Sequence, residues 1–141
     1  MQWKKEHIES ALAHEVDLTW WGWDNTEKAD FVGANLAYAD MTGANFSYDD
    51  LTGANLTGIN LEFAMLGGAN LTGANLRDAN LRGTYLGHTN MSGADLRWAD
   101  LFCANLTGAN LTGAKLTGAR YNEETLVPDG FDMVEAGAVL I

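Results

Sequence analysis

A five-residue repeat runs through residues 29–126 and constrains the fold more than any other feature of the chain. Twenty successive units share a large apolar residue at the centre, and this residue is Leu in fifteen of them. Ala stands two positions before the centre in fifteen units, and Asn or Asp stands between these two positions in fifteen. Gly follows two positions after the centre in eleven units, as in the runs 54–58 and 109–113. Such regularity predicts a repeat architecture.

Neither an α-helix nor a flat β-strand accommodates a period of five. Five helical residues turn through about 500°, so successive centres would step around the helix by roughly 140° and form no apolar stripe. A flat strand alternates its side chains, so an odd repeat would send successive centres to opposite faces. The chain must therefore bend within every repeat, and Gly, Asn and Asp supply the bend because they tolerate positive φ. A bend in each unit predicts a solenoid with Ala and the central residue facing inward.

The order Ala, Asn or Asp, Leu and then two variable outward residues resembles the motif of the pentapeptide-repeat family, over about seventy per cent of the chain. This resemblance implies an all-β fold, a right-handed quadrilateral parallel β-helix with four repeats in each of about five coils. It also implies that residues twenty positions apart are neighbours in adjacent coils. The family is common in cyanobacteria, and many of its members have no assigned biochemical role.

Length and composition predict one soluble domain. The 141 residues match the usual domain size, and no stretch approaches the apolar run of about 20 residues that spans a membrane. Lys4 and Lys5 are followed by Glu6 and Glu9 rather than by the apolar segment of a signal peptide, so we expect a cytoplasmic protein. Cys103 is the single cysteine, which predicts an outward free thiol. An incidental thiol is the simpler interpretation, and a redox role is the alternative.

The flanks of the repeats are expected to cap the open ends of the solenoid. Residues 1–28 are predicted to form a short α-helix over residues 2–14 followed by a Trp-rich segment. Residues 127–141 begin with a Pro-Asp-Gly turn signal and continue with apolar residues. This tail is predicted to cap the last coil, and a dimerisation tail is the alternative.

The chain shows no catalytic, cofactor-binding or metal-binding motif. His14 and Glu15 do not begin an HExxH motif, because Leu18 stands where the second His would be. His7 and His14 are seven positions apart, but a metal needs further ligands that this spacing does not supply. The glycines follow the repeat rather than a phosphate-binding motif. We therefore expect a non-enzymatic protein without a cofactor.

Stacking with a period of twenty gathers the large outward residues on two adjoining faces. Arg next to exposed aromatic rings resembles the composition of binding hot spots. The alternative is that isolated exposed aromatic residues need no explanation. The sequence favours a scaffold or protein-interaction module for an unidentified protein partner, and it leaves open a homodimer through a capped end. The predicted partner-binding patch consists of Phe63, Arg77, Arg82, Arg97, Trp98 and Phe102.

The formal net charge of −11 suggests a second functional class. Some members of the family that the sequence resembles mimic DNA and protect type II topoisomerases such as gyrase from drugs. Residues 29–126 hold ten acids and five bases, whereas duplex DNA of similar length carries about fourteen charges. DNA mimicry is therefore the alternative function. Direct binding of nucleic acid is not expected, because a protein of pI near 4.4 repels phosphate.

Four polar residues stand at inward Ala positions and test the pattern, namely Asp49, Thr84, Thr89 and Glu124. A lone buried carboxylate is costly, so Asp49 is expected either to lie in a distorted turn that exposes it or to accept hydrogen bonds from backbone amides. Thr84 and Thr89 are able to bond to backbone groups.

One outward column of Val32, Thr52, Thr72, Ser92 and Thr112 would suit ordered water or ice. The preferred interpretation of that column is that Thr suits extended chain wherever nothing larger is required.

Overall fold

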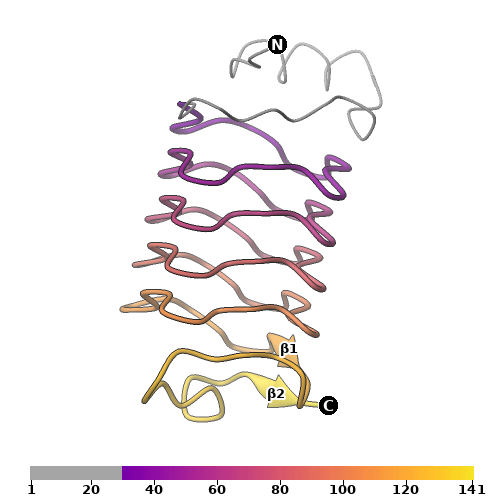
Figure 1. Ribbon diagram of the computed structural model, residues 1–141, viewed down its shortest axis with the longest axis vertical. Helices are drawn as coiled ribbons and strands as arrows, with labels where there is room; N and C mark the ends of the chain where they lie inside the picture. The colour runs from indigo at the N-terminus through magenta and orange to yellow at the C-terminus, as the bar shows by residue number, and fades with distance from the viewer. Residues whose placement is uncertain (1–29) are drawn as a thin grey trace.

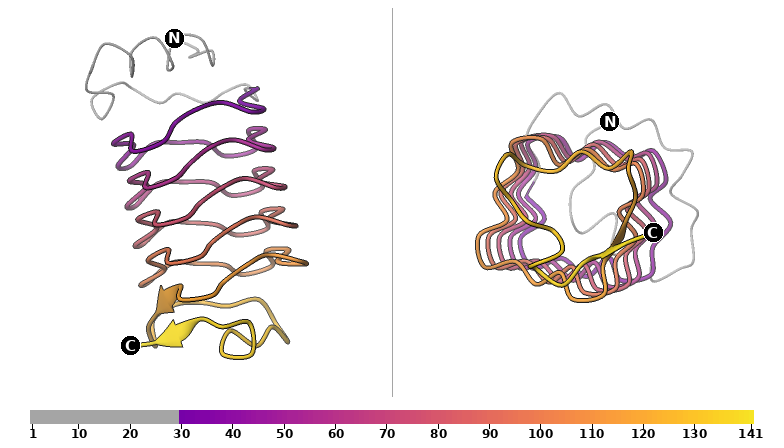
Figure 2. Two further views of the ribbon diagram at one scale, coloured as in Figure 1. Left: turned by 180° about the vertical axis from the view of Figure 1, so that it is seen from behind. Right: turned by 90° about the horizontal axis from the view of Figure 1, so that it is seen from below.

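The computed structural model describes residues 30–141, which form a right-handed parallel β-helix with four sides (Figure 1). Bridges join residues 20 apart from Asp30 with Asp50 to Asp100 with Arg120, so four repeats make one coil. Seen along the axis, the coils superimpose in a nearly square outline (Figure 2). These features confirm the predicted solenoid and, as far as Arg120, its register. The helical cap predicted over residues 1–28 lies outside the described residues.

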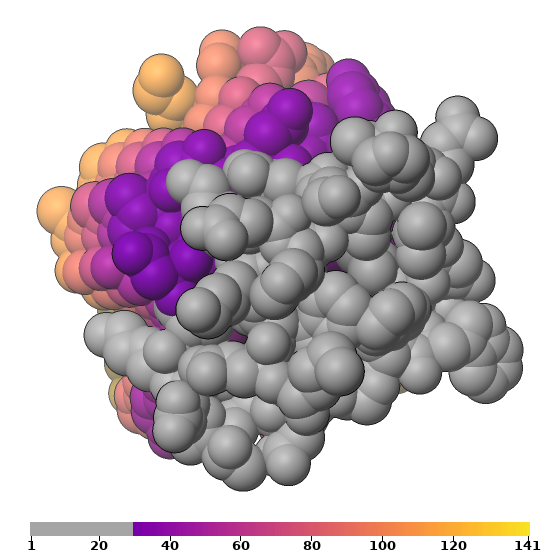
Figure 3. Space-filling model, turned by 90° about the horizontal axis from the view of Figure 1, so that it is seen from above, coloured from indigo at the N-terminus to yellow at the C-terminus, as the bar shows by residue number. Residues whose placement is uncertain are grey.

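The four sides are distinguished by the outward residue at the middle of each short extended piece. This residue stands between the inward Ala and the inward central residue, and it forms the bridge to the next coil. Where the coils are visible from above, the side chains of successive coils line up in straight rows (Figure 3). Side 1 holds Asp30, Asp50, Asn70, Asn90 and Asn110; side 2 holds Asn35, Asn55, Asn75, Asp95 and Lys115; side 3 holds Asp40, Asn60, Asn80, Asp100 and Arg120; side 4 holds Asn45, Met65, Tyr85, Asn105 and Leu126.

Every backbone N–H in a regular repeat has an acceptor, as residues 69–73 illustrate. The N–H groups of Asn70, Leu71 and Gly73 donate to carbonyls of neighbouring coils at 2.7–2.9 Å. Ala69 donates to the carbonyl of the preceding centre at 3.0 Å, which closes the turn. The fifth N–H, from Thr72, donates to Oδ1 of Asn70 at 3.0 Å. Asn or Asp is therefore favoured at this position, because its side chain satisfies the one N–H that no backbone carbonyl reaches.

The corners explain where Gly is used. All eighteen corners between residues 33 and 118 have positive φ at the second residue after the centre, with eleven Gly and seven other residues there. Only Gly adopts this left-handed region without strain, and other residues pay roughly 1–3 kcal/mol for it. The seven other residues are Tyr38, Tyr48, Phe63, Asp78, His88, Trp98 and Cys103.

The core consists of the stacked central residues and the stacked inward Ala residues, and almost all of them are fully buried. The hydroxyls of Thr84 and Thr89 donate to the carbonyls of Leu61 and Leu86, both at 2.8 Å, which confirms the predicted bonds to backbone groups. Asp49 is 2% exposed and its backbone follows the regular repeat, so the prediction of a distorted, exposed turn is wrong. Acceptance of backbone hydrogen bonds by its carboxylate stays a prediction.

The predicted register is wrong in the last repeat. Leu126, predicted as a central residue, is 53% exposed and bridges Asn105, which places it in the outward position of side 4. One extra residue after Tyr121 causes this shift. Thr125 takes the inward position instead and donates its hydroxyl to the carbonyl of Leu101 at 2.8 Å. Glu124 is exposed rather than turned inward.

The C-terminal tail lies across the end of the last coil (Figure 2). Strand β1 (Arg120–Tyr121) pairs in parallel with β2 (Val139–Leu140). Met133 and Ala138 are buried in the continuous core of the solenoid. No helix within residues 30–141 is long and apolar enough to cross a membrane.

Candidate functional site

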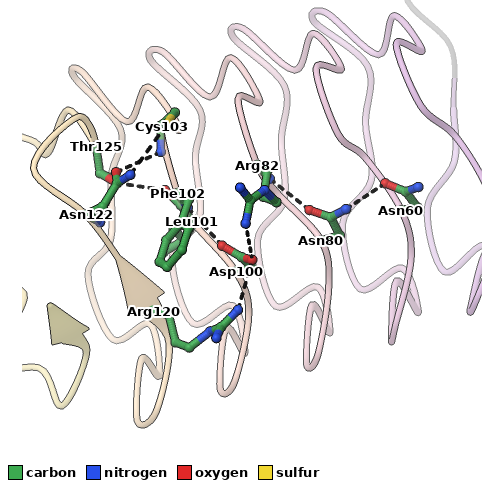
Figure 4. A network of polar contacts seen from close by, with 10 residues as sticks. All are labelled: Asn60, Asn80, Arg82, Asp100, Leu101, Phe102, Cys103, Arg120, Asn122 and Thr125. Carbon is green, nitrogen blue, oxygen red and sulfur yellow. Dashed lines mark hydrogen bonds and ion pairs between the residues drawn. The ribbon is translucent and has the colours of Figure 1, made fainter. Parts of the chain in front are cut away.

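A compact cluster of two arginines, one aromatic ring and one carboxylate lies on side 3 and its corner with side 4. Arg82 comes from the coil before Asp100 and Arg120 from the coil after it. Oδ2 of Asp100 accepts from Nη1 of Arg82 at 3.3 Å and from Nη2 of Arg120 at 3.1 Å (Figure 4). Their Cζ atoms lie 5.0 and 5.2 Å from the ring centroid of Phe102, within the range of cation–π attraction. We call these four residues the Arg82–Phe102 cluster.

The geometry of the Arg82–Phe102 cluster fixes its orientation but leaves it accessible. The N–H of Phe102 donates to Oδ1 of Asp100 at 3.1 Å, so both oxygens of this carboxylate are engaged. The side chain of Asp100 is 17% exposed, whereas those of Arg82 and Arg120 are 46% and 51% exposed. The carboxylate therefore holds two half-exposed guanidinium groups close to one ring.

Arg97 is held differently, on side 2. Its Nε and Nη2 donate to the two carboxylate oxygens of Asp95 at 2.8 and 2.6 Å. These side-chain hydrogen bonds are the main reason why the pKa of Asp95 lies below its ordinary value. The same pairing raises the pKa of Arg97. Arg77 lies in the same corner column, one coil before Arg97, as the register predicts.

The exposed aromatic residues Phe63 and Trp98 have a structural role at corners. The ring of Phe63 lies over Gly83, twenty residues further on, in the space that a Cβ there would occupy. Trp98 lies over Gly118 in the same way. All five aromatic residues with positive φ follow this rule, with the pairs Tyr38 and Gly58, Tyr48 and Gly68, Phe63 and Gly83, His88 and Gly108, and Trp98 and Gly118. Each ring still exposes its outer face.

Basic residues are segregated to one surface. From residue 77 to 120 there are five bases and three acids, a formal excess of +2, whereas residues 30–76 and 121–141 each hold five acids and no base. All five bases lie on sides 2 and 3 or at the corners of side 3. We call this region the basic surface, and its bases are Arg77, Arg82, Arg97, Lys115 and Arg120.

Other candidate features are internally engaged. Cys103 is exposed as predicted, and its Sγ lies 3.0 Å from Oε2 of Glu124. The same Sγ lies 3.6 Å from Nδ2 of Asn122 (Figure 4). Within residues 30–141, no group of three or more His, Cys, Asp or Glu residues is arranged to hold a metal ion. In the hydroxyl column, Thr52, Thr72 and Ser92 donate to the Asp or Asn two residues before them at 2.6–2.7 Å. Their protons are thus turned toward the protein.

A family model for pentapeptide repeats matches eight copies in the chain, over residues 25–48, 50–83 and 79–118. The chain belongs to the pentapeptide-repeat family. Its fold resembles that of a pentapeptide-repeat protein from the thylakoid lumen of Arabidopsis thaliana, with 30% sequence identity, a TM-score of 0.70, and coverage of 73% of this chain and 72% of the other. Among curated proteins, no sequence matches the chain significantly.

Two further pentapeptide-repeat structures were compared. Rfr23 from the cyanobacterium Cyanothece 51142 is 33% identical, with a TM-score of 0.61 and coverage of 76% of this chain and 69% of the other. QnrB1, a plasmid-mediated fluoroquinolone resistance protein, is 20% identical, with a TM-score of 0.38 and coverage of 81% and 78%. The likeness to QnrB1 carries no functional argument.

The pentapeptide-repeat geometry brings together only part of the predicted patch. Arg82 and Phe102 are in contact, while Arg97 pairs with Asp95 and the rings of Phe63 and Trp98 lie on corner glycines. Sequence reasoning missed Asp100 and Arg120, because it searched only the two positions after each centre. The sequence nevertheless carries a signal for Asp100 and Arg120. Arg120 replaces Asn or Asp at the bridging position and stands twenty residues after Asp100.

Proposed function

We propose that this pentapeptide-repeat protein is a non-enzymatic module that binds another protein through the basic surface. The observation that carries this proposal is the gathering of all five described bases on two adjoining sides of an otherwise acidic rod. Exposed Arg beside aromatic rings is enriched at binding hot spots. The parallel coils below this surface give it a rigid base, so little ordering entropy is lost on binding.

The rest of the outer surface supports this choice. On sides 1 and 4, the corner and bridging positions between residues 83 and 93 hold mainly Gly, Asn and Ser, with Tyr85 and His88 as the larger residues. Small polar side chains offer few anchors to a partner, since hot spots favour Trp, Tyr and Arg. The basic surface is therefore the place where the basic residues that depart from the repeat gather.

Mimicry of DNA against a type II topoisomerase is less well supported. A DNA mimic needs anionic groups along the length of the rod, because duplex DNA carries one charge per about 1.7 Å of axis. Here the acids at the two ends of the described region are separated by a band with a formal excess of +2. The positive charges of this band would repel the cationic groups with which a topoisomerase binds DNA.

Affinity capture from the native host tests the proposal with two matched double variants. Arg77→Gln with Arg82→Gln removes two charges from the basic surface. His88→Gln with Thr107→Ala changes two exposed corner residues between sides 4 and 1. We expect at least one protein that is recovered with the wild type and the second variant and is strongly depleted with the first.

Equal recovery of every captured protein with both double variants would contradict the proposed surface. Recovery of no specific protein at all with the wild type would contradict the function itself. Circular dichroism of each variant must match that of the wild type, so that lost capture is not caused by unfolding.

A further inference from the structure

The donor groups of the Arg82–Phe102 cluster exceed the acceptors that the protein offers them. A guanidinium group carries five N–H donors. Arg82 and Arg120 each place one of them on the same oxygen of Asp100, and no other described residue accepts from either side chain. Most of their donors therefore face solvent, although the groups themselves are held in position by Asp100 and Phe102 (Figure 4). Such preorganised donors suit carboxylates, which bind guanidinium groups in a bidentate way.

The dimensions of the basic surface favour a short ligand. From Arg77 to Arg120 the chain completes just over two coils, so the surface is about 10 Å high at a coil spacing of about 4.8 Å. An extended peptide advances about 3.3 Å per residue and crosses this height in about three residues. Above and below, the acidic segments would repel a longer polyanion such as nucleic acid.

We propose that the Arg82–Phe102 cluster is the binding site for a short acidic peptide segment of the partner, with two or three carboxylates. This inference rests on the proposed function and names the partner's chemistry. The carboxylates accept from the outer N–H groups of Arg82 and Arg120, while Asp100 keeps its own two contacts. Phe102 presents an apolar surface beside the two charges, which lowers the local dielectric and strengthens both pairs.

Arg97 provides a matched control within the same surface. It carries the same charge as Arg82, but two of its donors are committed to Asp95. If the ligand is recognised by directed donors, loss of Arg97 matters little. If the ligand merely responds to net charge, loss of Arg97 and loss of Arg82 weaken binding equally.

The test is a titration of the ¹⁵N-labelled full chain with the tripeptide Glu-Glu-Glu, acetylated and amidated at its ends, followed by NMR through the arginine Nε–H signals. We expect saturable shifts at Arg82 and Arg120, and shifts at Arg97 that are small. Arg82→Gln is expected to weaken binding about tenfold, as loss of a charge-assisted hydrogen bond implies, and Arg97→Gln less than about twofold. The backbone spectrum of each variant reports in the same experiment whether the solenoid is intact.

Four outcomes would overturn the inference. These are absence of saturable shifts at Arg82 and Arg120, equal weakening by Arg97→Gln and Arg82→Gln, equal binding of a Gln-Gln-Gln peptide, and equal binding of inorganic phosphate, which would indicate a simple anion site. The two proposals fail separately. If a protein is captured through the basic surface and the Glu tripeptide does not compete with it, only the acidic-peptide inference fails. If the tripeptide binds but no protein is captured, only the proposed function fails.

Discussion

At the residue scale, the repeat assigns a separate task to each position. The inward Ala and central residue fill the core, where each buried Leu contributes roughly 1.5–3 kcal/mol before entropy losses. The outward Asn or Asp accepts the N–H two residues later, as between Asn90 and Ser92 at 3.1 Å. Asp100 does the same for Phe102 and additionally binds two arginines. The outward Asn or Asp position thus accepts a backbone N–H in each case, and at Asp100 it also holds the candidate site together.

Replacing Asn90 tests the role of the side-chain acceptor. Its Oδ1 accepts from the N–H and from the hydroxyl of Ser92, at 3.1 and 2.7 Å. Asn90→Ala removes both bonds and is expected to lower the free energy of unfolding by about 1–2 kcal/mol. Asn90→Asp keeps an acceptor beside neighbours that carry no charge, so it should stay within about 0.5 kcal/mol of the wild type. Urea unfolding of both variants measures this difference, and equal losses would refute the acceptor role.

The ion pair between Asp95 and Arg97 predicts a defined pH dependence. Because the pKa of Asp95 is lowered in the folded protein, its stabilising effect is fully present above the unfolded value of about 3.9 and is lost as the pH falls through the lower folded value. Asp95→Asn retains the acceptor for the backbone but not the charge. We expect the variant to be less stable than the wild type above about pH 5 and to approach it in stability below about pH 4. A stability difference that stays constant from pH 7 to pH 3 would contradict this assignment.

At the element scale, each corner combines a left-handed residue with whatever lies on it from the neighbouring coil. Gly73 and Gly83 have nearly the same φ, +64° and +62°. A Cβ at Gly73 would meet nothing within 4 Å, whereas one at Gly83 would lie 2.6 Å from the ring of Phe63. The two corners therefore differ in packing alone. An aromatic residue at a corner offsets part of the cost of its own positive φ, because its ring packs on the glycine twenty residues later.

Alanine substitution separates backbone strain from ring contact. Gly73→Ala is expected to cost about 1 kcal/mol from positive φ alone. Gly83→Ala should cost about 1 kcal/mol more, because the ring of Phe63 must move off the corner. In a Phe63→Ala background, the cost of Gly83→Ala should fall to that of Gly73→Ala. The measurement is a thermal or urea double-mutant cycle, and an unchanged cost in that background would show that the ring is irrelevant.

The sequence predicted most of the fold and part of the candidate site. The period of five and the family resemblance predicted the four-sided register. This register makes Arg82 and Phe102, which are twenty residues apart, neighbours in adjacent coils. They did not predict that Leu126 turns outward, because Leu126 still stands five positions after Tyr121, as the repeat requires, although Glu124 and Thr125 depart from the motif. Nor did they predict that Arg97 pairs with Asp95, since side-chain torsions decide which neighbouring side an arginine reaches. The pairing of corner rings with glycines is a regularity of the sequence itself, because Gly stands twenty residues after five of the seven corners that lack it.

At the scale of the whole molecule, the solenoid is a stack in which each coil contacts only its neighbours. The end of such a stack exposes unpaired backbone groups unless a cap covers it. Strand β2 supplies this cover, since the N–H of Val139 donates to the carbonyl of Ala119 at 2.7 Å and that of Ile141 donates to Tyr121 at 2.9 Å. The tail also adds Met133 to the core.

Two proline substitutions test the capping role of β2. Val139→Pro removes the bond to Ala119 and is expected to destabilise the protein by about 1–3 kcal/mol. Leu140→Pro is the control. In the parallel ladder the N–H groups of Val139 and Ile141 point toward β1, so that of Leu140, between them, points away from it. Hydrogen exchange at the amides of the last coil should accelerate in the first variant and not in the second. Equal acceleration in both would contradict a specific role for this strand.

All of the assigned surfaces depend on one claim, that residues twenty positions apart are neighbours on the same side. The most direct measurement is thiol cross-linking in a Cys103→Ser background with a short bifunctional reagent. Asn55→Cys with Asn75→Cys places two thiols on adjacent coils of side 2, whose strands lie about 4.8 Å apart. Asn55→Cys with Asn80→Cys places them on different sides. The account predicts efficient intramolecular cross-linking of the first pair and little of the second, and the reverse result or equal cross-linking would contradict it.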